Sequence, residues 1–399
     1  MPEPGPRKGF SVRLIRVVAI ASVAVLPLLT TACGAGGSAA DTAPVVIGAD
    51  LELSGVNAPV GTTYSRALQL RVDQINAQGG VNGRRLILDA KDNRSDPTLS
   101  VANVNALISE PGIAGIIMGA CSGCASGVAK VINDAQVPTV SLAPATTVAR
   151  PVSDRKYIFK LGPDADNSAA ALANELRSAG TRRVALLSTD DVNGSDAVAA
   201  LSNQVAKVNA QVVSQELFRA TDTDLSQPVR SALAKNPDAL LVSAFPSQAS
   251  LVAKSARDAG YTKQILFDAT AAGDLFLSGP TADATDGAIM VAPQTLVIDD
   301  TIATTPAKTT RKRWFSDYTS RYGTFSGYSA YAADAVQLLV DAIRIVGGTQ
   351  RERIRDIMEG ASFDGLAGQI QFTPDNHSGV LPQSLTTVVA RSGRWRLLG

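Results

Sequence analysis

The chain is 399 residues long, with 45% hydrophobic residues, 5% aromatic residues and a formal net charge of +1. This balance of charge excludes the strongly basic surface that nucleic-acid binding requires, so we expect no nucleic-acid partner. The length exceeds what one hydrophobic core usually serves. The abundant Ala, Val and Leu suit sheets that are buried under helices on both faces. We therefore expect two globular lobes.

The first 33 residues have the pattern of an export signal followed by a lipid-attachment site. Basic residues lead into an apolar run over 17–29, which is too short to span a bilayer, and small residues precede Cys33. We expect a signal peptide over 1–32, lipidation of Cys33 and a flexible tether over 33–43. The protein would then be extracytoplasmic and lipid-anchored to the cell membrane. The alternative is an ordinary secreted protein in which Cys33 has no role.

Short aliphatic runs that predict strands alternate with amphipathic stretches that predict helices. In the first part, we expect strands at 45–47, 86–89, 113–118 and 138–141 and helices at 64–78, 97–110 and 125–135. In the second part, we expect helices at 169–179, 195–208, 225–235 and 247–259 and strands at 184–187, 212–216, 239–243 and 264–267. The last part predicts strands at 288–291, 369–372 and 386–390 and helices at 309–322, 329–346 and 351–359. Two series of βα units in tandem predict an α/β fold in which the C-terminal pieces complete both lobes.

Several motifs lie in loops and at helix ends of this pattern. They are Ser54-Gly55, Ile75-Asn76-Ala77-Gln78-Gly79-Gly80-Val81-Asn82-Gly83, Asp92-Asn93-Arg94-Ser95-Asp96-Pro97, Val137-Pro138-Thr139-Val140-Ser141, Ala256-Arg257-Asp258-Ala259-Gly260 and Tyr331-Ala332-Ala333-Asp334-Ala335. Through them the chain from Val45 to Gly399 resembles the extracytoplasmic solute-binding proteins of ABC importers. The resemblance is to the branched-chain amino acid (Leu/Ile/Val) binding type, which has a type I periplasmic-binding fold.

The resemblance implies two Rossmann-like lobes with parallel sheets, three hinge crossovers and a ligand in the cleft between the lobes. The first lobe would comprise 44–162 and 293–365, and the second 163–292 and 366–399. The implied function is high-affinity capture of a small solute, an amino acid or a related carboxylate or amide, and its delivery to ABC permease subunits. The protein would be a monomer without a cofactor and not an enzyme. The alternative is a solute-sensing lipoprotein that reports to a membrane receptor kinase, since both roles use cleft closure.

Candidate ligand contacts of the first lobe lie in the loops after strands 113–118 and 138–141. Ligands of open α/β sheets bind outside the carboxyl ends of the strands. By the resemblance, the hydroxyl of Ser122 would bond a ligand carboxylate, while Ala145 and Thr146 would offer backbone groups and a hydroxyl. The alternative for Ser122 and Thr146 is helix capping, which is a common role of Ser and Thr.

The second lobe departs from the family's pattern for amino acid ligands. Asn193 stands where an aromatic residue commonly precedes a glycine, and Phe245 replaces a tyrosine. The acidic residue that holds the ligand ammonium would fall near Ala269 or Thr270, neither of which is acidic. The neighbouring Asp268 either substitutes for it or caps its own loop. Asn193, Phe245, Asp268 and Thr270 are thus candidate ligand contacts, and a solute without an ammonium group is compatible with them.

Two further features could carry chemistry. Cys121 and Cys124 have C-x-x-C spacing before a predicted helix; we expect a structural disulfide, and the alternative is a thiol-redox protein that uses this Cys-Ser-Gly-Cys motif. His377 is the only histidine and lies in a turn-rich stretch, so we expect a solvated turn residue and not a catalytic base. The sequence contains no metal-ligand cluster, phosphate-binding glycine loop or serine elbow, and we expect no metal site.

Overall fold

The computed structural model describes residues 43–272, 277 and 281–398. The predicted signal peptide over 1–32, the predicted lipidation site Cys33 and all but the last residue of the predicted tether lie outside the described residues. In the part of the chain that the structure describes, no helix has the length and apolar character needed to cross a membrane.

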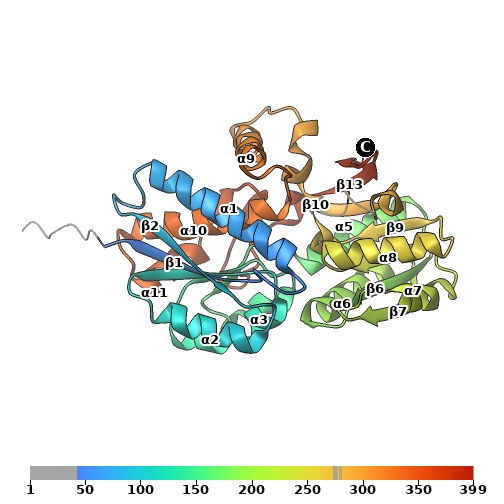
Figure 1. Cartoon of the computed structure of the whole chain (residues 1–399), viewed down its shortest axis with the longest axis horizontal. Helices are drawn as coiled ribbons and strands as arrows, with labels where there is room; N and C mark the ends of the chain where they lie inside the picture. The colour runs from blue at the N-terminus through green and yellow to red at the C-terminus, as the bar shows by residue number, and fades with distance from the viewer. Residues whose placement is uncertain (1–42, 273–276, 278–280, 399) are drawn as a thin grey trace, which may run out of the picture. The chain divides into compact units, whose positions relative to one another are not determined.

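The first lobe is built on a five-stranded sheet in which all paired strands are parallel (Figure 1). Its strands, in spatial order, are β2 (Leu86–Asp92), β1 (Val45–Leu51), β3 (Ile113–Met118), β4 (Thr139–Ser141) and β5 (Ile158–Lys160). Every residue of β1 and β3 is buried. The two strands are apolar runs because helices cover both faces of the sheet.

Helices of the first lobe form two layers around this sheet. The helices are α1 (Ala58–Ala77), α2 (Pro97–Ile108), α3 (Ser122–Gly127), α4 (Ala129–Asp134), α10 (Tyr328–Val346) and α11 (Arg351–Glu359). Figure 1 shows α1 and α10 on one side of the sheet and α2 and α3 on the other. Side chains of β1 divide accordingly: Ile47 packs in the core that contains α1 and α10, whereas Val46 packs in the core of α2, α3 and α4. Alternate residues of a strand point to opposite faces, so one short run serves two cores.

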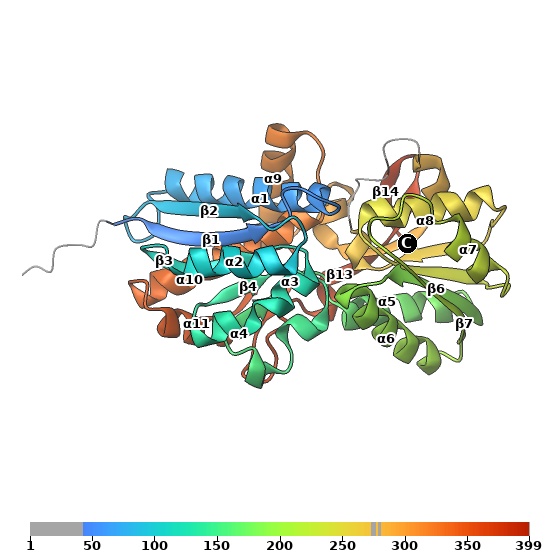
Figure 2. The same cartoon turned by 60° about the horizontal axis from the view of Figure 1, so that its bottom comes forward.

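The second lobe has a seven-stranded mixed sheet. Its strands, in spatial order, are β14 (Arg394–Leu397), β13 (Leu385–Arg391), β10 (Ile289–Pro293), β9 (Gln264–Phe267), β8 (Ala239–Ser243), β6 (Arg183–Thr189) and β7 (Gln211–Phe218). The strands from β7 to β10 are parallel, whereas β13 and β14 pair antiparallel. The covering helices, seen in Figure 2, are α5 (Ala165–Ser178), α6 (Val192–Lys207), α7 (Ser226–Leu233) and α8 (Pro246–Asp258).

The chain passes between the two sheets three times, after β5, after β10 and before β13. The second passage contains α9 (Pro306–Tyr322), and the third follows a hairpin of β11 (Ser362–Asp364) and β12 (Gln369–Gln371). The predicted α/β fold with two lobes and three crossovers is confirmed. The sheet of the second lobe differs from the expected all-parallel arrangement only where the returning C-terminal strands join its edge.

Most predicted elements are present, and the differences have local causes. α1 begins at Ala58, before the expected start at residue 64, because Pro59 is tolerated in a first helical turn and Gly61 lets the helix approach Glu52. A Cβ at Gly61 would lie 2.0 Å from the carbonyl oxygen of Glu52. The single helix expected over 125–135 is divided into α3 and α4 at Val128.

Candidate functional site

The buried carboxylate of Glu52 binds the loop that follows β3. Glu52 directly follows β1, and its side chain accepts the backbone N–H groups of Ala120 and Cys121, both at 2.9 Å. Gly119 makes this contact possible, because a Cβ there would lie 2.3 Å from Glu52 Oε2. Burial raises the pKa of Glu52, and the two N–H donors oppose this rise. Glu52 fixes the loop that carries Ser122, a role that the sequence analysis missed.

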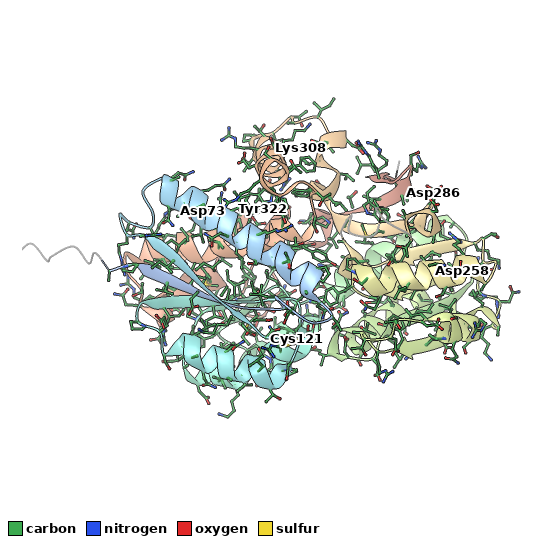
Figure 3. All side chains as sticks on the ribbon, in the orientation of Figure 1. Asp73, Cys121, Asp258, Asp286, Lys308 and Tyr322 are labelled. Atoms are coloured by element: carbon green, nitrogen blue, oxygen red, sulfur yellow. A yellow bond between two sulfur atoms is a disulfide. The ribbon has the colours of Figure 1, made fainter. Side chains whose placement is uncertain are left out.

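The same loop is closed by a disulfide bond. Cys121 and Cys124 are bonded, with their α-carbons 5.1 Å apart, and Figure 3 labels Cys121 near the end of the first lobe that faces the second. This is the disulfide that the sequence predicted. Ser122 does not cap a helix; its hydroxyl accepts the N–H of Ala145 at 3.2 Å and so joins the loops after β3 and β4.

The loop after β4 faces the second lobe through Thr146. Thr146 begins a short 3₁₀ helix over Thr146–Ala149, and the cap position belongs to Ala145, which has no side-chain capping bond. The Thr146 N–H donates to Oδ2 of Asp196 on α6 at 2.7 Å. Ser122, Ala145 and Thr146 therefore lie together, and Asp196 approaches them from the other lobe. Asp196 was missed because nothing in its local sequence marks it.

Asn193 lies at the start of α6, where the chain turns tightly after β6. Asp191 caps the helix by accepting the N–H of Gly194 at 2.8 Å, and a Cβ at Gly194 would lie 1.7 Å from the carbonyl oxygen of Thr189. This tight turn buries Asn193, which is 3% exposed. Neither its amide nitrogen nor its amide oxygen has a hydrogen-bond partner among the described residues. Buried polar atoms are normally paired, so the hydrogen-bonding capacity of this amide is unused among the described residues.

Asp268 follows β9 and is surrounded by donors of its own lobe. Its carboxylate accepts the Ser243 hydroxyl at 2.6 Å, the Thr270 N–H at 3.0 Å and the Thr270 hydroxyl at 3.2 Å. Burial raises its pKa to about 6. The structure thus shows the loop-capping alternative for Asp268. Thr270 is occupied as well, because its carbonyl oxygen accepts the hydroxyl of Tyr328 on α10. Phe245, also buried, precedes α8 and packs in an apolar core.

The crossovers between the sheets are held by a buried ion pair. Lys160, at the end of β5, lies 3.6 Å from the carboxylate of Asp164, and both side chains are almost fully buried. Asp164 also accepts the N–H of Asn167 and the hydroxyl of Ser378, the latter from the third crossover. Burial opposes the charge of both groups, but Lys160 and the hydrogen bonds keep the pKa of Asp164 below its usual value.

His377 is not the solvated turn residue that we expected. Its side chain is fully buried and stacks on Phe159, with ring centroids 4.3 Å apart. Nδ1 lies 3.0 Å from the carbonyl oxygen of Ile158, and Nε2 lies 3.3 Å from Glu359 Oε1. The expectation failed because the third crossover runs beside β5, where the N–H of Lys160 donates to the His377 carbonyl oxygen. Burial lowers the pKa of His377, and Glu359 opposes this effect.

Within residues 43–272, 277 and 281–398, no group of three or more His, Cys, Asp or Glu side chains has the arrangement of a metal site. Where the two lobes face each other, the groups described above can form hydrogen bonds with a bound molecule. The first lobe contributes a serine hydroxyl and loop backbone groups, and the second contributes the unpaired amide of Asn193. Such an arrangement can hold a small polar molecule by hydrogen bonds.

Comparisons with known proteins agree with this fold. The chain is 23% identical over 352 residues to the Leu/Ile/Val-binding protein homolog 7 of Brucella abortus (strain 2308), which covers 84% of this chain and 86% of the relative. An extracellular ligand-binding receptor from Rhodopseudomonas palustris HaA2 superimposes with a TM-score of 0.82 at 23% identity, covering 89% of this chain and 99% of the receptor.

A second solved structure is an ABC transporter solute-binding protein from R. palustris in complex with benzoate. It superimposes with a TM-score of 0.79 at 18% identity and covers 89% of this chain and 96% of that protein. The family model described as "Periplasmic binding protein" matches residues 44–393, which is most of the sequence. With its two α/β lobes and three crossovers, the chain therefore belongs to the periplasmic binding protein family, a non-enzymatic family of extracytoplasmic proteins that bind small solutes and work with ABC transporters.

Proposed function

We propose that this protein captures a small carboxylate or amide solute between its lobes and delivers it to the permease of an ABC importer. The observation that carries the proposal is the buried amide of Asn193, which has no hydrogen-bond partner among the described residues. Asn193 lies in the first turn of α6, the helix whose Asp196 contacts Thr146 of the first lobe. On the first lobe, the hydroxyl of Ser122 accepts one hydrogen bond and can still donate, and the hydroxyl of Thr146 has no partner among the described residues. A solute that bonds both sides would stabilise the closed arrangement.

The second lobe favours a solute without an ammonium group. An amino acid ligand needs an acid with free acceptor capacity, but the carboxylate of Asp268 already accepts three hydrogen bonds from Ser243 and Thr270. An amide such as that of Asn193 can instead donate to a carboxylate or a carbonyl and accept from an amide or a hydroxyl. The benzoate complex of a solute-binding protein with a similar structure supports a carboxylate solute that has no ammonium group.

A thermal-shift panel followed by calorimetry tests this proposal. The panel contains benzoate, 3,4-dihydroxybenzoate, isobutyramide and L-leucine. Asn193→Ala should weaken binding of the best solute by about 5-fold or more, since loss of a buried hydrogen-bond partner typically costs about 1–3 kcal/mol. Asn203→Ala is the matched control, because Asn203 is exposed on the same helix. Tight binding of L-leucine alone, unaffected by Asn193→Ala, would contradict the proposal.

We also propose that the mature protein begins at Cys33 and is held to the membrane by a lipid on this residue. The basic start, the short apolar run and the small residues before Cys33 support this anchor. Cys33→Ala should move the protein from the membrane fraction to the soluble or culture fraction. Identical partitioning of the parent and the variant would exclude the anchor.

A further inference from the structure

Asp196 makes a polar contact between the lobes, and the proposed function gives this contact no role. It lies one turn into α6, and its half-buried carboxylate accepts the N–H of Thr146, fifty residues away in the first lobe. The N–O distance of 2.7 Å is short, as expected for a hydrogen bond to an ionised acceptor. The hydroxyl of Thr146 is buried beside the same carboxylate.

The donor that Asp196 occupies is one of the few available in its loop. The N–H of Ala143 donates to Ser141 Oγ and that of Ala145 donates to Ser122 Oγ, both at 3.2 Å. The Thr146 N–H opens a 3₁₀ helix, so the helix itself provides no acceptor for it. The loop therefore presents this N–H outward, and the protein's own carboxylate from the other lobe accepts it.

We propose that Asp196 and the Thr146 N–H form an interlobe latch, which holds the lobes together and which an anionic solute group must displace. Two carboxylates that share one N–H would lie within a few ångströms of each other and repel. A solute carboxylate at Thr146 thus competes with Asp196, and the latched fraction of the protein lowers the apparent affinity. The displacement step rests on the proposed function, whereas the latch itself does not.

Lys160 is the nearby cation that could neutralise Asp196, but it is already engaged. It is fully buried, pairs with Asp164 and donates to the carbonyl oxygens of Gly162 and Pro163. Burial raises the pKa of Asp196, and the charge of Lys160 opposes this rise through space. The hydrogen bond from Thr146 is therefore the directed contact that fixes the Asp196 side chain across the two lobes.

The latch can be tested without any solute by measuring the distance between the lobes. Nitroxide labels are placed at Lys130→Cys on α4 and Lys207→Cys on α6, both exposed, in a chain that also carries Cys33→Ala so that only the new thiols react. Pulsed electron resonance then gives the distance distribution. Asp196→Ala should broaden this distribution and move it to longer distances. Asp190→Ala is the matched control, because it removes an exposed carboxylate close to the start of α6.

A backbone donor can be removed only by proline, so Thr146→Pro is the complementary variant. Ala145 has φ −59° and ψ 130°, which suits a residue before proline, and Thr146 is the first residue of its helix. Thr146→Pro should open the lobes as Asp196→Ala does, and the double variant should open them no further. Thr146→Val, which keeps the N–H, should resemble the parent. If Thr146→Pro fails to fold, the comparison of Asp196→Ala with Asp190→Ala still decides.

A distance distribution of Asp196→Ala that matches the parent would overturn the latch. Benzoate calorimetry tests the competition: Asp196→Ala should bind benzoate at least about 5-fold more tightly than the parent. Equal or weaker binding would overturn the competition. Absence of benzoate binding in both proteins would count against the proposed solute class, while the solute-free distances would still decide whether the latch exists.

Discussion

Substitution of Asp268 by asparagine should change how the stability of the protein depends on pH. The Asp268 side chain is 2% exposed and accepts hydrogen bonds from Ser243 and Thr270, and its burial raises the pKa from 3.8 to about 6. Asparagine has nearly the same shape and keeps one oxygen for the Thr270 N–H, but it carries no charge. The variant therefore isolates the contribution of the buried charge.

The sign and size of the effect follow from the raised pKa. The folded protein holds the Asp268 proton more tightly than the unfolded chain, so this group stabilises the fold at low pH. Its contribution is lost as the pH rises through about 6. A shift of about two pKa units corresponds to about 3 kcal/mol. The stability of Asp268→Asn relative to the parent should thus increase by roughly 2–3 kcal/mol between pH 4 and pH 7.5.

Urea unfolding at several pH values measures this difference. The comparison with the parent cancels the titration of other carboxylates, which act on both proteins. Asp190→Asn, which replaces an exposed acid after β6, is the control for the substitution itself. If the difference between Asp268→Asn and the parent is flat with pH within about 0.5 kcal/mol, Asp268 does not titrate as a buried carboxylate and the reasoning is wrong.

Three other predictions concern the first lobe and the third crossover. Glu52→Gln should destabilise the protein by about 1–3 kcal/mol in urea unfolding, because one of the two buried N–H groups loses its acceptor; a loss below 0.5 kcal/mol would contradict this. Changing both Cys121 and Cys124 to serine should cost about 2 kcal/mol for so small a loop, and the intact mass of the unreduced parent should be two hydrogens below that of the dithiol. His377 has a lowered pKa, so its stabilising contribution is present above pH 6.5 and is lost as the pH falls. The parent should lose stability relative to His377→Gln on acidification from pH 7 to pH 5, and parallel curves would refute this.

The sequence predicted the buried strands best. β3, β8 and β9 have the expected bounds, because a fully buried strand is a continuous apolar run between polar turns. β5 was missed because three residues are too few to show the alternating pattern of a strand. The chain passes to the second lobe directly after this strand. The burial of His377 was missed because its partners lie on other elements of the fold. Ile158 is 219 residues away in the sequence, and Glu359 is 18 residues away.

The candidate site was predicted only in part, because some of its contacts join residues that are remote in the sequence. Resemblance placed Ser122, Ala145 and Thr146 in neighbouring loops, and the hydrogen bond between Ser122 and Ala145 joins these loops in the structure. Asp196 could not be found from the sequence, since its contact spans fifty residues and two lobes. Glu52 could have raised suspicion as an acid directly after a buried strand, but such an acid is equally consistent with a solvated loop.

Three buried carboxylates of this protein accept backbone N–H groups of loops. Glu52 accepts two, Asp334 accepts those of Leu366 and Ala367 at 2.8 Å each, and Asp268 accepts that of Thr270 together with two hydroxyls. An acid after a strand is therefore a weak indication of a charged ligand, because the loop itself needs an acceptor. The group that can recognise a ligand is the one whose hydrogen-bonding capacity the fold leaves unused. Among the described residues Asn193 meets this condition and Asp268 does not, which supports the proposal of a solute without an ammonium group.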